Sequence, residues 1–242
     1  MTKGNSMNKK LLSGLCAAVL LSGLVGCGPK EPKQDTTTST STNETKETEN
    51  NNTATTNNSE VTEKNFKDFP ETDEKYFTYE EWQEGYAIYG CSSEDKVINV
   101  PKTINGKPVI AIAERGLANK QTCEAIVLPD TVRVISKSAF TLDVNLKFIH
   151  LGSSLERIGD NAFNGCNSLE FVKFPEGMQE IGINVFANAK VIKYIEIPAS
   201  VTEITDVFYF TASNNPDVEI RTPKGSKAEE VANSLGLKVV NN

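Results

Sequence analysis

A repeat with a period of 23 residues constrains the fold of this chain more than any other feature. Four segments, beginning at residues 123, 146, 169 and 192, each hold three apolar residues at the same spacing. Three further apolar columns keep the period: Val132, Leu155, Met178 and Val201; Ile135, Ile158, Ile181 and Ile204; and Phe140, Phe163 and Phe186. A fixed period of about 20–30 residues predicts a solenoid, in which each unit buries its apolar face against its neighbours.

Within one repeat the residues predict a strand followed by a tight turn. Val172 and Phe174 are two positions apart, so an extended segment places both side chains on the same side. Pro175 ends this strand because proline has no N–H to continue the ladder. Residues 159–163 of the preceding repeat are typical of one helical turn, with Asp160 as its N-cap. We therefore predict a mainly β solenoid with short helical turns.

Atypical segments flank the repeats and are predicted to cap a solenoid that would otherwise expose its core and its strand edges. Residues 76–100 are rich in aromatic and apolar side chains and form the predicted N-terminal cap. The repeats follow over residues 101–217, with an insertion in the first repeat and a loss of register in the fifth. Residues 218–242 form the predicted C-terminal cap, where Ser226 begins a helix with the spacing of a capping box. The folded domain is expected to span residues 66–242.

Residues 1–26 are predicted to be a targeting signal outside the fold. Two lysines precede an apolar run over residues 11–25, which is too short for a comfortable membrane span. The run ends in Leu-Val-Gly-Cys, which resembles the lipobox of bacterial lipoproteins. That resemblance implies cleavage before Cys27 and a diacylglycerol thioether on its sulfur. The alternative is an ordinary secretory signal with an incidental cysteine, and translation could begin at Met1 or at Met7.

Residues 27–65 are predicted to be a disordered tether. The stretch consists largely of Thr, Asn, Glu, Lys and Ser, and residues 34–59 contain a single apolar residue, Ala54. Such a composition cannot bury enough apolar surface to offset the entropy lost on ordering. The tether is expected to hold the folded domain away from a membrane.

The repeat resembles the BspA-type leucine-rich repeat of bacterial surface proteins, over about residues 76–242. The positions that match the family pattern are Ile158, Gly159, Ala162, Phe163, Cys166 and Leu169. Departures from the pattern are Gly152 in place of Pro, and Asp143 and Ala189 in place of Cys. The resemblance implies a short, curved leucine-rich repeat solenoid whose strand-side face binds proteins, commonly in adhesion.

A candidate ligand face follows from the alternation of side chains along each strand. The residues expected to point outward are Phe148, His150, Phe171, Lys173, Tyr194 and Glu196. Three aromatic residues in adjacent repeats would lie about 5 Å apart per step, and an exposed stripe of this kind often marks an interaction site. Two alternatives remain: the rings stack only to stabilise the sheet, or the N-terminal segment covers them.

The cysteines do not indicate a metal or redox centre. Cys16 lies within the signal, and three cysteines remain in the folded part: Cys91, Cys123 and Cys166. Three thiols cannot all pair, and none has metal-site spacing. We expect buried free thiols, with a disulfide between Cys91 and Cys123 left open.

The sequence favours a non-enzymatic, lipid-anchored protein at the bacterial cell surface that binds a protein partner from a host or a bacterium. No catalytic set, metal pair or phosphate loop can be assembled around the single histidine, so no cofactor is expected. The net charge of −7 and the mixed charges argue against nucleic acid as a partner. The alternative function is a carbohydrate or cell-wall glycan binding module, because exposed aromatic rings also stack on sugars.

Overall fold

A computed structural model describes residues 60–204, 208, 211 and 215–242. The predicted signal, Cys27 and most of the predicted tether lie outside these residues, as does part of the irregular fifth repeat, at 205–207, 209–210 and 212–214. The described elements are η1 (Phe66–Asp68), η2 (Glu74–Tyr76), β1 (Phe77–Trp82), β2 (Gly85–Cys91), β3 (Val97–Asn99), β4 (Thr103–Ile104), β5 (Lys107–Ile112), β6 (Ala125–Val127), β7 (Val134–Ile135), β8 (Phe148–His150), β9 (Arg157–Ile158), β10 (Phe171–Lys173), β11 (Glu180–Ile181), β12 (Tyr194–Glu196), β13 (Glu203–Ile204), β14 (Glu219–Arg221), α2 (Lys227–Ser234) and β15 (Lys238–Val240).

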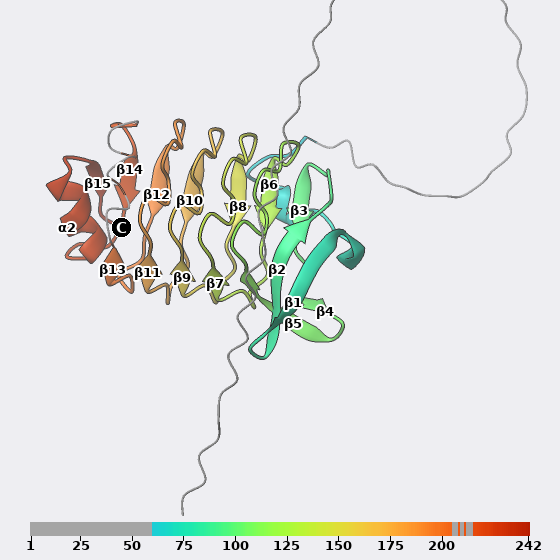
Figure 1. The fold of residues 1–242 in the computed structure, drawn as a ribbon. Coiled ribbons are helices and arrows are strands. Elements are labelled where there is room, and N and C mark those ends of the chain that lie inside the picture. The colour runs from blue at the N-terminus through green and yellow to red at the C-terminus, as the bar shows by residue number, and fades with distance from the viewer. Residues whose placement is uncertain (1–59, 205–207, 209–210, 212–214) are drawn as a thin grey trace, which may run out of the picture. The chain divides into compact units, whose positions relative to one another are not determined.

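The predicted solenoid is present as a row of coils with a strand on each of two sides (Figure 1). On one side, parallel strands run in the orders β3-β6-β8 and β10-β12-β14-β15, and we call their outer surface the strand face. On the other side the order is β1-β2-β5-β7-β9-β11-β13. Neighbouring strands pair in parallel one repeat apart, as Phe171 pairs with Tyr194. The sequence period therefore sets the register on both sides from β6 to β8, from β10 to β12 and from β7 to β13.

The core consists of ladders of like side chains that run through the coils. Phe140, Phe163 and Phe186 are fully buried. Their ring centroids are 5.1 Å apart from Phe140 to Phe163 and 5.7 Å apart from Phe163 to Phe186, with the ring planes within 12° of parallel. The predicted column is confirmed, and each ring packs in the favourable distance range for aromatic pairs.

The predicted helical turn at residues 159–163 is wrong. The segment is a turn in which Asn161 has a φ of 57°, a left-handed conformation that asparagine tolerates better than most residues. The amide of Asn161 donates to the carbonyl of Ile183 in the next coil, and the amide of Phe163 donates to that of Val185. Asp160 likewise accepts the amide of Ile183 at 2.8 Å instead of capping its own repeat. The amides of Asn161 and Phe163 thus find their hydrogen-bond partners in the next coil instead of within a helical turn.

Each end of the row carries additional structure. At the N-terminal end β1 and β2 form an antiparallel hairpin, and the predicted insertion is the β4–β5 hairpin. Asn105 and Gly106 form its two-residue turn, with φ of 48° and 77°, as a type I′ turn requires. At the C-terminal end Ser226 accepts the amide of Glu229 at 3.1 Å, which confirms the N-cap of α2.

Candidate ligand-binding face

The predicted site residues lie in two adjacent columns of the strand face. Phe148, Phe171 and Tyr194 follow one another on β8, β10 and β12, and Ala125 precedes them on β6. The second column holds His150, Lys173 and Glu196 on the same strands. The period thus brings together all six residues that the sequence analysis selected.

The expectation that the aromatic stripe is exposed is wrong for two of its three rings. Phe148 is 6% exposed and Phe171 is 7% exposed, whereas Tyr194 is half-buried. Phe171 stacks on Tyr194 with ring centroids 5.2 Å apart, and Phe148 lies 6.0 Å from Phe171. The other face of Phe148 is covered by Phe66, whose ring centroid is 5.6 Å away. The rings therefore bury one another, and a preceding segment buries the first.

The covering segment consists of residues 60–68, which we call the N-terminal strap. Val61 is 4% exposed and Phe66 is 3% exposed, so the assignment of residues up to 65 to a disordered tether extends too far. The two residues belong to an apolar cluster outside the main core, whose members are Val61, Phe66, Val97, Ala125, Val127, Phe148 and Phe171, with Phe69 and Tyr194 at its edge. The sheet is therefore apolar on both surfaces at its N-terminal end.

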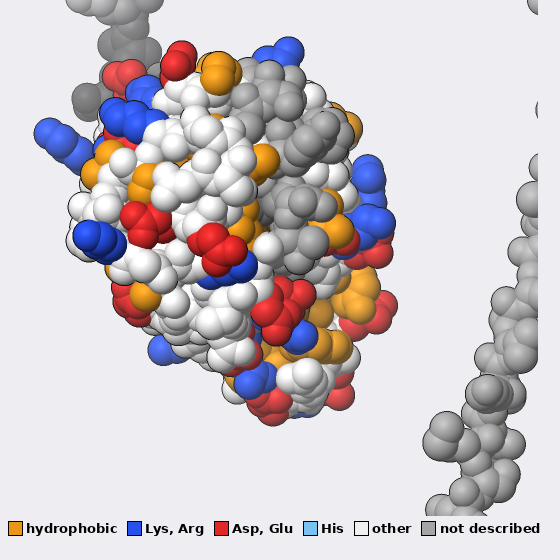
Figure 2. All heavy atoms as spheres, turned by 90° about the vertical axis from the view of Figure 1, so that its left-hand side faces the viewer, with side chains coloured by type: hydrophobic (Ala, Val, Ile, Leu, Met, Phe, Trp, Pro, Cys, Tyr) orange, Lys and Arg blue, Asp and Glu red, His pale blue; other side chains and the backbone are white. Residues whose placement is uncertain are grey.

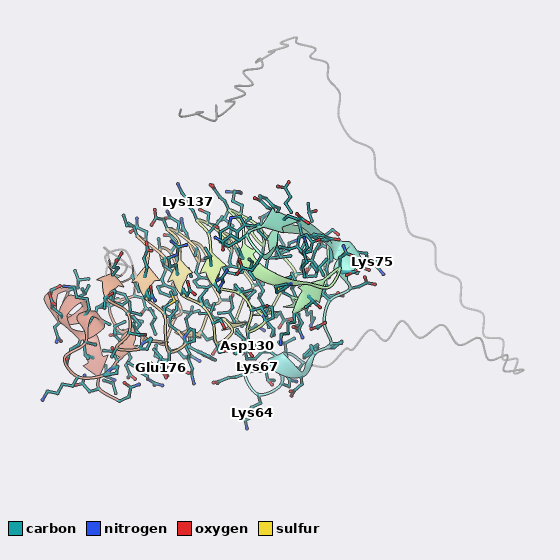
Figure 3. The ribbon with its side chains drawn as sticks, turned by 90° about the horizontal axis from the view of Figure 1, so that it is seen from below. Lys64, Lys67, Lys75, Asp130, Lys137 and Glu176 are labelled. Carbon is teal, nitrogen blue, oxygen red and sulfur yellow. The ribbon has the colours of Figure 1, made fainter. Side chains whose placement is uncertain are left out.

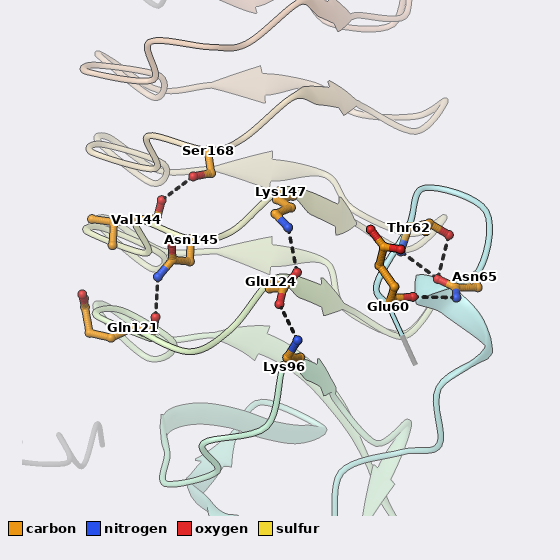
Figure 4. Close-up of polar contacts among 10 residues, drawn as sticks. All are labelled: Glu60, Thr62, Asn65, Lys96, Gln121, Glu124, Val144, Asn145, Lys147 and Ser168. Carbon is orange, nitrogen blue, oxygen red and sulfur yellow. Dashed lines mark hydrogen bonds and ion pairs between the residues drawn. The ribbon is translucent and has the colours of Figure 1, made fainter. Parts of the chain in front are cut away.

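The strap folds on itself as a small turn. Asn65 accepts from the amide of Thr62 at 2.8 Å and from its hydroxyl at 2.9 Å, and donates to the carbonyl of Glu60 at 3.0 Å (Figure 4). The amide of Phe66 donates to the carbonyl of Thr62 at 3.1 Å. These bonds hold Val61 and Phe66 in a compact unit that presents both side chains to the sheet.

Asn99 anchors the chain immediately after the strap. Its side-chain amide donates to the carbonyl of Phe69 at 2.7 Å, and its backbone amide donates to the hydroxyl of Thr72 at 3.1 Å. The amide of Thr72 donates back to the carbonyl of Asn99 at 2.8 Å. The exit of the strap is thus fixed to β3.

A row of alternating charges runs beside the aromatic column. Glu124 pairs with Lys147 at 2.8 Å and with Lys96 at 3.1 Å (Figure 4), and Glu170 pairs with Lys193 at 2.6 Å. The hydrogen bond from Lys147 lowers the pKa of Glu124, with a smaller contribution from Lys96. The charges compensate one another from coil to coil, so this row adds little net charge to the face.

The strap ends short of the C-terminal part of the strand face, where Tyr194 is the last ring of the stack. The guanidinium of Arg221 lies 3.7 Å from the ring centroid of Tyr194, and the ammonium of Lys173 lies 5.8 Å from it. Glu219 accepts from Arg221 at 2.6 Å and from Lys238 at 2.9 Å. Among the described residues Lys173 has no ion pair. This open part combines an aromatic ring with cations, and we call Lys173, Tyr194, Glu196 and Arg221 the Tyr194 patch.

His150 is half-buried at the end of β8. Burial lowers its pKa, with a smaller lowering by Lys67 and an opposing effect of Asp130. Figure 3 shows Lys67 and Asp130 on the same side of the domain and Lys137 on the opposite side. Within the described ranges no group of three His, Cys, Asp or Glu side chains could hold a metal ion.

The sequence of the repeat region assigns the chain to a protein family. Residues 84–220 match the family model "BspA type Leucine rich repeat region" in six copies. The chain belongs to the BspA-type leucine-rich repeat family. No curated protein sequence matches it significantly.

Solved structures show the same fold as this BspA-type chain. A leucine-rich repeat protein from T. pallidum (TpLRR) superposes with a TM-score of 0.60 at 28% identity, covering 63% of this chain and 71% of that one. A leucine rich cell surface protein from Faecalibacterium prausnitzii A2-165 has a TM-score of 0.53 at 26% identity. That match covers 64% of this chain and 39% of the other. In the described part of the BspA-type chain, no helix is both long and apolar enough to cross a membrane.

The three cysteines of the described residues, Cys91, Cys123 and Cys166, are buried free thiols, which confirms the expectation and leaves Cys91 and Cys123 unpaired. Burial raises the pKa of Cys123 to about 12 and that of Cys166 well above its usual value. Neutral thiols in such surroundings behave as small apolar groups.

Asp143 is the buried polar group that the sequence analysis noted only as a departure from the family pattern. It is fully buried in the column of Cys166 and Ala189. One carboxylate oxygen, Oδ1, accepts the amide of Lys120 at 2.7 Å, and the other, Oδ2, has no partner. Burial raises its pKa to about 8, against a smaller lowering by the hydrogen bond from Lys120. Burial therefore favours the neutral form of this carboxyl group in the folded chain.

Proposed function

We propose that this protein is a non-enzymatic, extracytoplasmic protein that binds a protein partner through its strand face, in adhesion to a host cell or another bacterium. The Tyr194 patch carries the proposal. Tyr194 is held by Phe171 on one side and contacts Arg221 on another, so its position is fixed before a partner arrives. Tyrosine and arginine are enriched among the residues that dominate protein–protein binding energy. A fixed side chain also loses little rotamer entropy on binding.

The glycan alternative has less support from the arrangement of the rings. Stacking on a sugar requires an aromatic ring with a free face. In the stripe, Phe148 lies between Phe66 and Phe171, and Tyr194 is contacted by Phe171 and Arg221. The rings offer edges, a hydroxyl and flanking charges instead, which suit a protein surface with mixed polarity. The end of the domain next to the patch, which carries α2 and β15, shows both charges interspersed (Figure 2).

Replacement of the central tyrosine tests the proposed function. Partners are captured from envelope and host-cell extracts on the immobilised full-length chain, identified, and measured against single variants. Tyr194→Ala is expected to weaken binding about 30-fold or more, the effect of losing a dominant contact of about 2 kcal/mol. The matched control is Tyr89→Ala, which removes a 47% exposed tyrosine of β2 outside the strand face. Equal affinity of the two variants would contradict the proposal, and glycan-array binding lost in Tyr194→Ala would favour the alternative.

The proposed location is the outer side of a cell membrane, with the chain anchored by a diacylglycerol on Cys27. Support comes from the lipobox-like sequence that ends at Cys27 and from the F. prausnitzii relative, a protein described as a cell surface protein. We expect radiolabelled palmitate to be incorporated into the wild-type chain and to be absent from Cys27→Ala. Incorporation that persists in the variant would remove the anchor from the account without affecting the strand face.

A further inference from the structure

The N-terminal strap adheres to the strand face by apolar contact. Its described hydrogen bonds, made through Thr62 and Asn65, all stay within residues 60–68. The bonds from Asn99 begin only at Phe69, beyond the strap. Residues 60–68 therefore form a small unit with internal hydrogen bonds, and its two buried side chains, Val61 and Phe66, which we call the knobs, pack on the sheet. The strands of this sheet pair with one another without any hydrogen bond to the strap.

Opposite charges on the strap and on the charged row favour the contact between them. The pKa of Lys147 is raised chiefly by its hydrogen bond to Glu124 and to a lesser extent by Glu60. The pKa of Lys193 is raised chiefly by Glu170 and to a lesser extent by Glu63. Two glutamates of the strap, Glu60 and Glu63, thus act electrostatically on two lysines of the charged row, and they lie on either side of Val61 in sequence.

We propose that the part of the strand face covered by the strap, which we call the seat, is the binding site of a separate protein ligand. The segment of this ligand that binds has the same chemistry as the strap. This ligand is a protein segment that forms a tight turn and carries an aliphatic residue and an aromatic residue five positions apart, as Val61 and Phe66 are. Like the strap, the ligand carries glutamates on either side of its aliphatic residue, with a charge opposite to that of Lys147 and Lys193. The strap and the ligand compete for Phe148 and Phe171, and displacement of the strap extends the Tyr194 patch into a continuous aromatic stripe.

The inference deepens the proposed function and rests on it, because the strand face is the binding surface in both. The inference specifies the kind of protein segment that binds, and it makes binding depend on displacement of the strap. If the strap is open in a fraction of molecules, the apparent dissociation constant of any competitor rises by the inverse of that fraction. An intact strap therefore weakens ligands that need Phe148 more than it weakens ligands that need only Tyr194.

The test uses a fluorescent peptide with the sequence of residues 58–71 and the full-length chain in two forms. One form is wild type, and the other carries Val61→Ser and Phe66→Ser, which empties the seat without touching the coils. The peptide is expected to bind the double variant at least tenfold more tightly than wild type. A peptide with serine at both knob positions is expected not to bind, and addition of Phe148→Ser to the double variant should abolish binding.

Controls separate the possible failures. Lys64→Ala, a strap variant outside the apolar cluster, should behave as wild type, and circular dichroism checks that every variant is folded. The single variant Phe66→Ala provides the same comparison if the double variant does not fold. Equal peptide affinity for wild type and variant, no binding to the variant, or binding that persists with Phe148→Ser would each overturn the inference. Peptide binding without any captured partner would support the seat and contradict the proposed function, whereas a captured partner with no peptide binding would do the reverse.

Discussion

Phe163→Ala is expected to lower the free energy of unfolding by about 3–5 kcal/mol, the range for a large aromatic residue removed from a packed core. Phe163 is fully buried and stacks on Phe140 and Phe186 in the adjacent coils. Its loss leaves a cavity bounded by two rings from different repeats. In a solenoid each repeat is stabilised mainly by its neighbours. The substitution should therefore weaken the packing at both interfaces that this coil forms with its two neighbours.

Urea denaturation followed by circular dichroism measures this effect. Ile183→Ala is the matched control, because Ile183 is 38% exposed on the turn of the next repeat and should cost far less. Phe163→Leu keeps most of the volume and should lie between the two. Equal destabilisation by Phe163→Ala and Ile183→Ala would mean that the phenylalanine ladder is not the core of the domain.

Asp143→Asn is expected to change how stability depends on pH. Because the pKa of Asp143 is raised from 3.8 to about 8 in the folded chain, the folded state keeps a proton that the unfolded state releases. The free energy of unfolding of wild type should therefore fall as the pH rises from about 4 to about 8, and this contribution should be constant above that. At about 1.4 kcal/mol per pKa unit, the titration of Asp143 lowers the free energy of unfolding at pH 7 by about 4 kcal/mol relative to its value below pH 4.

The variant keeps an oxygen to accept the amide of Lys120 and does not titrate. We expect wild type and Asp143→Asn to differ by less than about 1 kcal/mol at pH 5, and the variant to be the more stable by about 3–5 kcal/mol at pH 8. Asp130→Asn is the control, because backbone donation by Ser153 lowers the pKa of Asp130, so the effect of the substitution should vary far less between pH 5 and pH 9 than that of Asp143→Asn. A constant difference between wild type and Asp143→Asn over the same range would contradict a protonated buried carboxyl group.

The period of 23 residues sufficed to predict the coils and the phenylalanine column. Each column residue meets its own counterpart one repeat away, so sequence spacing translates directly into contact. The same logic failed for the turn at Asn161. Its hydrogen bonds go to the next coil, and a local helix pattern cannot report partners that lie 22 positions away, as Ile183 does.

The strap could not be found by the period because it lies outside the repeats. Val61, Phe66 and Phe69 stand in a polar stretch and look isolated in sequence. Cover of the aromatic column by the N-terminal segment was one of two alternatives that the sequence left open, and the packing of Phe66 on Phe148 bears it out for this ring. Composition alone therefore placed the end of the tether at residue 65, although Val61 is already buried. Asp143 was recognised as a departure from the pattern, but its raised pKa depends on burial, which the repeat pattern does not report.

The strap covers the aromatic stripe at Phe148 and leaves Tyr194 only half-buried. The most direct measurement is a nuclear Overhauser spectrum of the full-length chain with labelled phenylalanine rings. With the two ring centroids 5.6 Å apart, cross-peaks between Phe66 and Phe148 are predicted, and they should vanish in Phe66→Leu. Absence of these cross-peaks, with Phe66 at the chemical shifts of an unfolded chain, would contradict the account.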